Sequence, residues 1–336
     1  MKATRPILCI GTTPAVQRVM VFPKLAVGAV NRAATTIDGA AGKSVNVAKV
    51  LHALGECVVA TGFLGGARGE FVRNVLRERG IALAFIPVGE QTRQCTTVID
   101  ESAGAQTELV EESRPVAPDN YEKLMRFLRR RVQGCRAVVM SGTLTPGAPA
   151  HFYFECTRLA RAAGVLSVVD ALGSALLKTL KASPSLVKPN RAELAATVGR
   201  EVKTEAAVVS GMRELRELGA ERVVVTAGKE PTLAFDGRNV WRVHTPRIPA
   251  VNPIGSGDAF TAGLVWRLLR GDDLGEACRW ASAAGAANAL TLMAGEVERA
   301  EVDRLAKRTV VERLLESRSP KAEGRRKAET RTPKRA

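Results

Sequence analysis

The chain has 336 residues, of which 46% are hydrophobic, and this length suits one large α/β domain or two smaller ones. No apolar run reaches the roughly 20 residues that a membrane span needs, and the first residues lack the apolar core of a signal peptide. Six single cysteines without a CxxC pair and three dispersed histidines argue against a metal cluster and a histidine-based mechanism. We therefore expect a soluble cytoplasmic protein.

The net charge of +16 is compatible with a nucleic-acid partner or with attraction of anionic substrates such as nucleotides and sugar phosphates. Residues 316–336 hold eight basic and three acidic residues and almost nothing apolar, so we expect this tail to be disordered and solvated. Aromatic residues make up only 4% of the chain, without the interleaving that single-strand binders use. Nucleic-acid binding is not expected, with weak contact by the tail as the alternative.

Short apolar runs alternate with amphipathic segments along most of the chain. Such alternation predicts a three-layer α/β fold in which a mostly parallel sheet has helices on both faces. Val47, Val50, Leu51 and Leu54, for example, recur at helical spacing. In chain order we expect a strand at 7–10, a helix at 44–54, a strand at 58–62, a helix at 120–132, strands at 137–141, 166–170 and 186–188, a helix at 204–218, strands at 222–226, 232–235 and 239–243, and helices at 257–269 and 273–290.

Two segments in the first third of the chain look extended but fall outside this alternation. They are residues 17–34 and 92–112, and we expect them to form a small β-lid. The lid would belong to one domain that spans residues 1–315, followed by the basic tail at 316–336.

The strongest chemical signal is the run NPIGSGDAF, which starts at Asn252. Gly255, Ser256 and Gly257 precede an expected helix, so backbone N–H groups can converge at its positive end and cradle an anion. Asp258 follows at once, within reach of a hydroxyl that attacks a phosphorus atom held there. The alternative is a plain loop with Asp258 as a favourable first-turn acid.

A second polar pair follows the strand expected at 186–188. Asn190 and Glu193 lie three residues apart, so at a helix start they share a face. Their oxygen atoms suit water-mediated binding of Mg²⁺, which a nucleotide kinase requires. Alternatively, Asn190 caps the helix and Glu193 completes a capping box.

Residues 41–44 read AGKS and contain the GKS of a phosphate-binding P-loop. That motif also requires a glycine five residues before Gly42, where this chain has Ile37, and no clear strand leads into the run. We therefore reject a P-loop nucleotide site.

Together and in order, these motifs resemble the PfkB, or ribokinase-like, family of carbohydrate kinases. The matching runs are NPIGSGDAFTAG at 252–263, KPNRAEL at 188–194 and the run at 39–46, and further matches extend from 12–15 to 294–296. Their order is most similar to the branch that contains 1-phosphofructokinase and tagatose-6-phosphate kinase. The resemblance implies a ribokinase-like fold with a β-lid, ATP and Mg²⁺ as cofactors, a sugar phosphate as acceptor, and a homodimer through the lid.

The resemblance also implies a role for each matching residue. The catalytic base would be Asp258, with an anion hole of Gly255, Ser256 and Gly257. The residues that would contact ATP are Lys188, Asn190, Glu193, Thr226, Gly228 and Asn288, with Asn190 and Glu193 also serving Mg²⁺ through water. Those that would contact the acceptor are Gln17, Arg32, Gly39, Gly42, Lys43, Asn46, Arg93 and Ser141, of which the two arginines suit a phosphate.

Several positions depart from the family pattern. Gln17 stands where the family usually has an aspartate, Ala41 and Ser44 replace glycines, and Ala171 and Leu172 replace the usual Thr-Ser pair. A neutral amide should select sugar hydroxyls differently from a carboxylate, so a kinase of a free sugar or nucleoside is an alternative. A second alternative is a non-catalytic sugar-sensing or nucleic-acid-binding protein that uses the basic tail, although the intact glycine-rich cradle argues against it.

Overall fold

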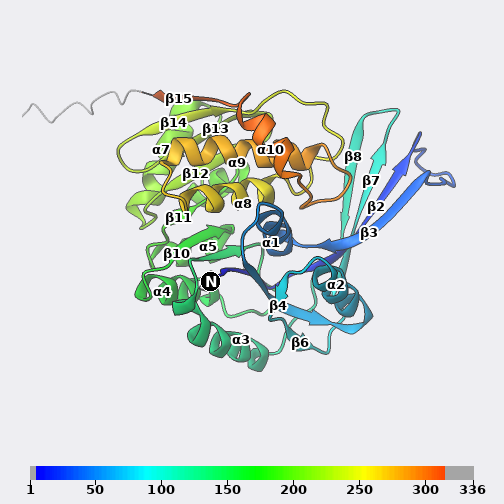
Figure 1. The fold of residues 1–336 in the computed structure, drawn as a ribbon, viewed down its shortest axis with the longest axis horizontal. Coiled ribbons are helices and arrows are strands. Elements are labelled where there is room, and N and C mark those ends of the chain that lie inside the picture. Colours follow the sequence, from blue (N-terminus) through cyan, green and yellow to red (C-terminus); the bar gives the residue numbers. More distant parts are fainter. Residues whose placement is uncertain (1–4, 315–336) are drawn as a thin grey trace, which may run out of the picture.

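A computed structural model describes residues 5–314, so the expected disorder of the tail at 316–336 concerns residues outside the described part. Helices cover both faces of a large sheet to form the body, and a smaller sheet projects from one side of it (Figure 1). We call this smaller sheet the lid. No helix within residues 5–314 combines the length and the apolar composition needed to cross a membrane.

The body sheet has 11 strands, parallel at its centre and antiparallel at one edge, where β13–β15 are added. Central strands are buried on both faces, which is why they read as continuous apolar runs rather than as alternating patterns. Across the sheet the order is β15 (Val310–Leu314), β14 (Val240–His244), β13 (Glu230–Phe235), β12 (Val223–Ala227), β11 (Leu186–Val187), β10 (Leu166–Asp170), β9 (Ala137–Ser141), β1 (Ile7–Gly11), β4 (Val58–Gly65) and β5 (Ala82–Leu83), with β6 (Ile86–Val88) also paired with β4.

Two sets of helices cover the two faces of the sheet, and each set has its own hydrophobic core. The first core holds the buried sides of α1 (Lys43–Ala53), α2 (Gly66–Glu78), α8 (Ser256–Leu268), α9 (Leu274–Ala289) and α10 (Arg299–Ala306). The second holds those of α3 (Pro118–Arg131), α4 (Phe152–Ala162), α5 (Gly173–Leu180), α6 (Arg191–Val198) and α7 (Glu205–Glu217). The expected three-layer fold is confirmed, and the strands and helices expected from the sequence are present.

The lid is a four-stranded sheet built from two separate parts of the chain. Its order is β3 (Thr35–Ala41), β2 (Ala15–Phe22), β7 (Arg93–Asp100) and β8 (Ala105–Val110). The β7–β8 hairpin lies within the segment expected at 92–112, but the structure differs from the extended segment expected at 17–34. β2 ends before Pro23, which has no N–H to donate, and a loop with Gly28 at φ 80° precedes β3.

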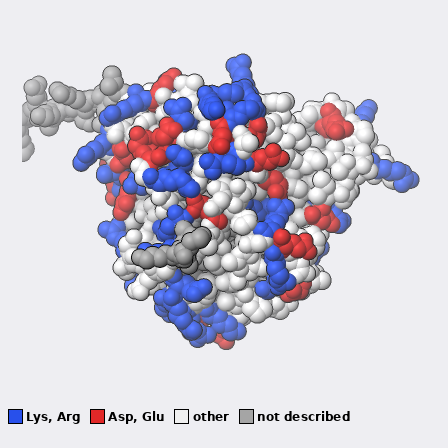
Figure 2. Space-filling view, viewed as in Figure 1, with Lys and Arg blue, Asp and Glu red and all other residues white. Residues whose placement is uncertain are grey.

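The charged side chains of the body are mixed rather than segregated by sign. On the face shown in Figure 2, the Lys and Arg side chains form several groups that acidic and uncharged residues separate. Elsewhere in the described residues, local ion pairs such as Arg158–Glu155 and Arg304–Glu301 set opposite charges side by side. This face of the described residues therefore gives no support to a continuous basic groove of the kind that binds nucleic acid.

The lid packs onto the loop that follows α9. Val19, Val21 and Ile99 form a small hydrophobic cluster with Leu292 and Met293 of that loop. On β8, the Gln106 side chain donates a hydrogen bond of 3.2 Å to the carbonyl of Val251. Apolar and polar contacts thus hold the lid against the segment that leads into α8.

A buried lysine of α1 ties the base of the lid to the same loop. Only 1% of the Lys49 side chain is exposed, and its Nζ donates to the carbonyls of Ala40 on β3 and Ala294 at 3.1 and 2.7 Å. The Nζ also lies 2.9 Å from the carboxylate of Glu296, which in turn pairs with Arg79. Burial lowers the pKa of Lys49, and the Glu296 carboxylate opposes that shift.

Replacing this lysine should therefore destabilise the whole fold. Lys49→Met leaves two carbonyls and one carboxylate oxygen without their shared donor, and we expect the free energy of unfolding to fall by about 3 kcal/mol. Urea denaturation measures it, with Lys24→Met in the exposed lid loop as the matched control. Equal urea midpoints for the two variants would contradict the anchoring role of Lys49.

Candidate active site

A cavity of about 400 Å³ lies between the lid and the carboxyl ends of β10, β11 and β12. Open parallel sheets bind ligands at this edge because side chains from several strand ends and loops meet there. From the lid the lining residues are Ala15, Gln17, Ala41, Arg93, Cys95, Glu108 and Val110. From the body they are Gly42, Lys43, Asn46, Asp170, Lys188, Asn190, Glu193, Thr226, Ile254, Gly255, Gly257 and Asp258.

The backbone cradle expected at the start of α8 forms one wall of this cavity. Gly255 has φ 84°, in the left-handed region, and a Cβ at this position would lie 2.7 Å from the Cβ of Ala294. α8 begins at the next residue, so its positive dipole end faces the cavity. The N–H groups of Ser256 and Asp258 donate to the carbonyls of Pro253 and Gly255 at 3.1 and 3.0 Å, and Gly257 itself lines the cavity. Behind the cradle, fully buried Asn288 donates to the carbonyl of Ile254 at 2.9 Å and to Ser256 Oγ at 3.3 Å.

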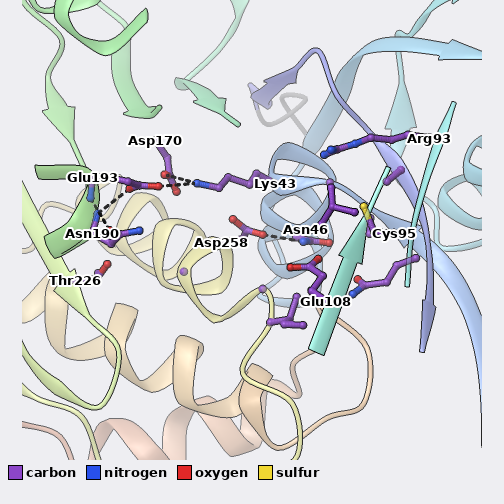
Figure 3. Close-up of a pocket in the computed structure, with 18 of the residues that line it drawn as sticks. Lys43, Asn46, Arg93, Cys95, Glu108, Asp170, Asn190, Glu193, Thr226 and Asp258 are labelled. Atoms are coloured by element: carbon purple, nitrogen blue, oxygen red, sulfur yellow. Dashed lines mark hydrogen bonds and ion pairs between the residues drawn. The ribbon is translucent and has the colours of Figure 1, made fainter. Parts of the chain in front are cut away.

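Asp258 lies in the first turn of α8 and is 6% exposed. Its Oδ2 accepts a hydrogen bond of 2.8 Å from Asn46 Nδ2 on α1 (Figure 3). Burial raises the pKa of Asp258 to about 7; the Lys43 ammonium group opposes this rise and the Asp170 carboxylate adds to it. A carboxyl group that titrates near neutral pH is suited to accept and return a proton.

Asp170 at the end of β10 is the charged counterpart of Asp258. Its Oδ1 lies 3.3 Å from Lys43 Nζ, and its Oδ2 lies 3.0 Å from Lys188 Nζ and accepts from Thr261 at 3.1 Å. Burial raises the pKa of Asp170, but the Lys188 and Lys43 ammonium groups outweigh it and hold the pKa below its ordinary value. The environment therefore separates the two carboxyl groups into one that stays ionised and one that can exchange a proton.

The Asn190–Glu193 pair forms a full capping box at the start of α6. Glu193 N donates to Asn190 Oδ1 and Asn190 N donates to Glu193 Oε2, both at 2.8 Å. Glu193 Oε1 remains 3.5 Å from Lys43 Nζ at the cavity wall. Residues 5–314 contain no group of three or more Asp, Glu, His or Cys that could cage a metal. The two oxygen donors thus fit contact with Mg²⁺ through water rather than direct enclosure.

Six residues predicted for the site do not line the cavity. Arg32 is exposed on the lid loop, and Gly228 is exposed in the turn after β12. Gly39 pairs with Gln17 in the lid, and a Cβ there would meet the Met293 side chain. Ser141 is buried and its Oγ has no hydrogen-bond partner. The other two, Ser256 and Asn288, build the cradle from its outer side. Their roles toward a ligand stay predictions.

Seven lining residues were not among the predicted site residues, and three of them carry a side chain that can ionise: Asp170, Cys95 and Glu108. Asp170 is the last residue of a buried strand, and a polar side chain at the carboxyl end of a parallel strand is a signal that could have found it. Cys95 and Glu108 gave no such signal, because an alternating lid strand does not reveal which face turns toward the body. Their place in the cavity comes from the orientation of the lid.

Residues 5–298 match the profile described as pfkB family carbohydrate kinase. A tagatose-6-phosphate kinase from Staphylococcus epidermidis is 30% identical over 314 residues, which cover 91% of this chain and 99% of that protein. A possible 1-phosphofructokinase structure from Thermotoga maritima has 25% identity and a TM-score of 0.86, covering 92% and 99% of the two chains. Phosphofructokinase-2 from Escherichia coli in complex with fructose-6-phosphate has 26% identity and a TM-score of 0.83, covering 90% and 99%.

The raised pKa of Asp258 predicts how the stability of the ligand-free protein depends on pH. Because the folded pKa of about 7 exceeds the ordinary 3.8, the folded state binds this proton more tightly than the unfolded state does. The stability that the proton provides is complete below pH 3.8 and is lost as the pH rises to about 7. Asp258→Asn removes this loss, so the variant should match the wild type near pH 4 and exceed its unfolding free energy by roughly 4 kcal/mol at pH 8.

Urea denaturation at both pH values measures this difference, and Asp119→Asn at the start of α3 is the control. If the difference in unfolding free energy between Asp258→Asn and the wild type is the same at both pH values, Asp258 is ionised in the folded protein at little cost in stability.

Proposed function

Because this chain belongs to the pfkB family of carbohydrate kinases, we propose that it transfers the γ-phosphoryl group of ATP to a hydroxyl of a hexose phosphate, such as tagatose 6-phosphate or fructose 1-phosphate. The observation that carries the proposal is the position of Asp258. Its carboxyl group lies in the cavity one turn into α8, directly after the Gly255 cradle, with a pKa of about 7. A base and an anion-binding backbone thus share one short segment.

In the proposed reaction, Asp258 takes the proton of the acceptor hydroxyl, and the oxygen of that hydroxyl forms a bond with the γ-phosphorus. The bond between that phosphorus and the bridging oxygen of ADP breaks, and ADP leaves with the electron pair. Asn46 donates to the Asp258 carboxylate and so fixes the orientation of the base. Uptake of this proton leaves Asp258 neutral, and the buried position of Asp258 favours the neutral form.

The transferred group carries negative charge that the site must stabilise. The positive dipole end of α8 and the Lys43 and Lys188 ammonium groups provide positive charge at the cavity. Lys188 lies beside the cradle, since a Cβ added at Gly257 would be 3.9 Å from its Nζ. Mg²⁺ bound with ATP would supply further neutralisation of the phosphates. Asn190 and Glu193 are the residues that would contact it through water, and Thr226 would lie beside the nucleotide.

The phosphate of the acceptor is proposed to bind at Arg93 on the lid. This guanidinium lines the cavity and donates to two backbone carbonyls, and its buried Nε has no hydrogen-bond partner among residues 5–314. A planar guanidinium is the side chain best suited to bind phosphate oxygens in pairs. Closure of the lid over the sugar would exclude water and limit ATP hydrolysis.

A panel of acceptors tests this function. ADP release should be measured with fructose 1-phosphate, fructose 6-phosphate and tagatose 6-phosphate, and in parallel with fructose, ribose and a nucleoside. We expect one hexose phosphate to give the highest kcat/KM, because Arg93 contributes binding energy only for a phosphorylated acceptor. With that acceptor, Asp258→Asn should lower kcat by about 10²- to 10⁴-fold, which is the usual contribution of a general base.

Two results would count against the proposal. Faster turnover of free sugars than of all three hexose phosphates would favour the alternative of a free-sugar or nucleoside kinase, to which the neutral Gln17 side chain is suited. Near-normal turnover of Asp258→Asn, with Asp119→Asn as the control, would remove Asp258 from its role as the base.

A further inference from the structure

One face of the lid turns a set of side chains toward the cavity, and the strand register explains which. Gln17 on β2 lies beside Cys95 on β7, which pairs in turn with Val110 on β8. Two residues further along the strands, Thr97 pairs with Glu108. Because alternate residues share a face of a sheet, Cys95 and Thr97 point the same way, and so do Glu108 and Val110. Glu108 is the carboxylate that this face presents to the cavity.

The polar groups on this face differ in their hydrogen bonding. Gln17 donates from Nε2 to Thr97 Oγ1 at 2.8 Å, and Arg93 donates to two backbone carbonyls. Within residues 5–314, the Glu108 carboxylate has neither a hydrogen-bond nor an ion-pair partner. Burial against the cavity raises the pKa of Glu108, and the Arg93 guanidinium opposes that rise. Glu108 is thus an acceptor that lines the cavity, is exposed in the ligand-free protein and has lone pairs open to a ligand.

The carboxylates on the opposite wall are already engaged. Asp170 is held by two lysines, Glu193 by a lysine and a helix cap, and Asp258 by the Asn46 amide. Figure 3 shows the Glu108 side chain directed from its lid strand toward the Asn46–Asp258 pair. A sugar placed with one hydroxyl at Asp258 would therefore present another part of its ring to Glu108.

We propose that Glu108 is a specificity-determining residue that accepts a hydrogen bond from a hydroxyl of the acceptor sugar other than the one that is phosphorylated. This inference rests on the proposed function. A carboxylate attracts hydroxyl donors and repels a phosphate, so Glu108 and Arg93 would orient the acceptor with its phosphate at the arginine and its hydroxyls at the glutamate. Among the described lid residues that line the cavity, Glu108 is the one carboxylate, whereas Gln17, two strands away, is neutral.

Glu108→Gln tests the proposal with little change in shape, and Glu101→Gln in the β7–β8 turn is the matched control on the same lid. For the preferred acceptor, Glu108→Gln should lower kcat/KM by roughly 10- to 100-fold, the range for loss of a charged hydrogen bond. The KM for ATP should change less than twofold. Monodeoxy analogues of the acceptor, one for each hydroxyl, then identify the contact. With the analogue that lacks the contacted hydroxyl, wild type and Glu108→Gln should perform equally.

The inference is overturned if Glu108→Gln and Glu101→Gln both keep the wild-type kcat/KM, or if the loss in Glu108→Gln is the same for every deoxy analogue. Thermal melting of both variants separates these outcomes from misfolding, since an unchanged melting temperature is expected for an exposed lid position. A wild-type enzyme that phosphorylates only free sugars would contradict the sugar-phosphate proposal instead. The same comparison on those sugars would still decide whether Glu108 contacts a hydroxyl.

Discussion

Two lysines meet at the carboxylate of Asp170, and this ionic contact joins the elements that build the site. Lys188 follows β11, Lys43 opens α1, and the Asp170 carboxylate also accepts from Thr261 on α8. The contact brings the start of α1 to the start of α8, where Asn46 reaches Asp258. It also sets the electrostatics, because an ionised Asp170 adds to the pKa rise that burial causes at Asp258, while Lys43 limits it. Removing the charge of either lysine would change the pKa of both Asp170 and Asp258.

The lid supplies what the body lacks. The body offers the cradle, the Asp258 carboxyl group and the lysines, all suited to the proposed phosphoryl transfer but carrying little information about which sugar is held. The cavity side of the lid carries an arginine, a glutamine and a glutamate. Polar contacts of this kind discriminate strongly, because a substrate that lacks the matching group leaves a desolvated partner unpaired. The lid is therefore the element in which the choice of acceptor is expected to lie, whereas the chemistry belongs to the body.

The body could be predicted from the sequence because its signals are local. Apolar runs mark buried parallel strands, and the glycines around Ser256 with the following Asp258 mark an anion cradle at a helix start. The lid could be predicted only in part, since β3 lies beyond the loop that was expected to be extended, and its cavity face depends on the docking of the whole sheet. Asp170 and Glu108 illustrate the two cases: the first sits at a strand end that sequence can identify, and the second owes its position to long-range register.

The proposed function depends on an Asp258 carboxyl group that exchanges its proton near neutral pH. Infrared difference spectroscopy of the ligand-free wild type against Asp258→Asn, recorded from pH 4 to 9, measures this directly through the carbonyl band of the protonated acid. We predict a band assigned to Asp258 that persists through pH 6 and disappears with a midpoint near 7. A band that has vanished by pH 5, as for an exposed aspartate, would contradict it.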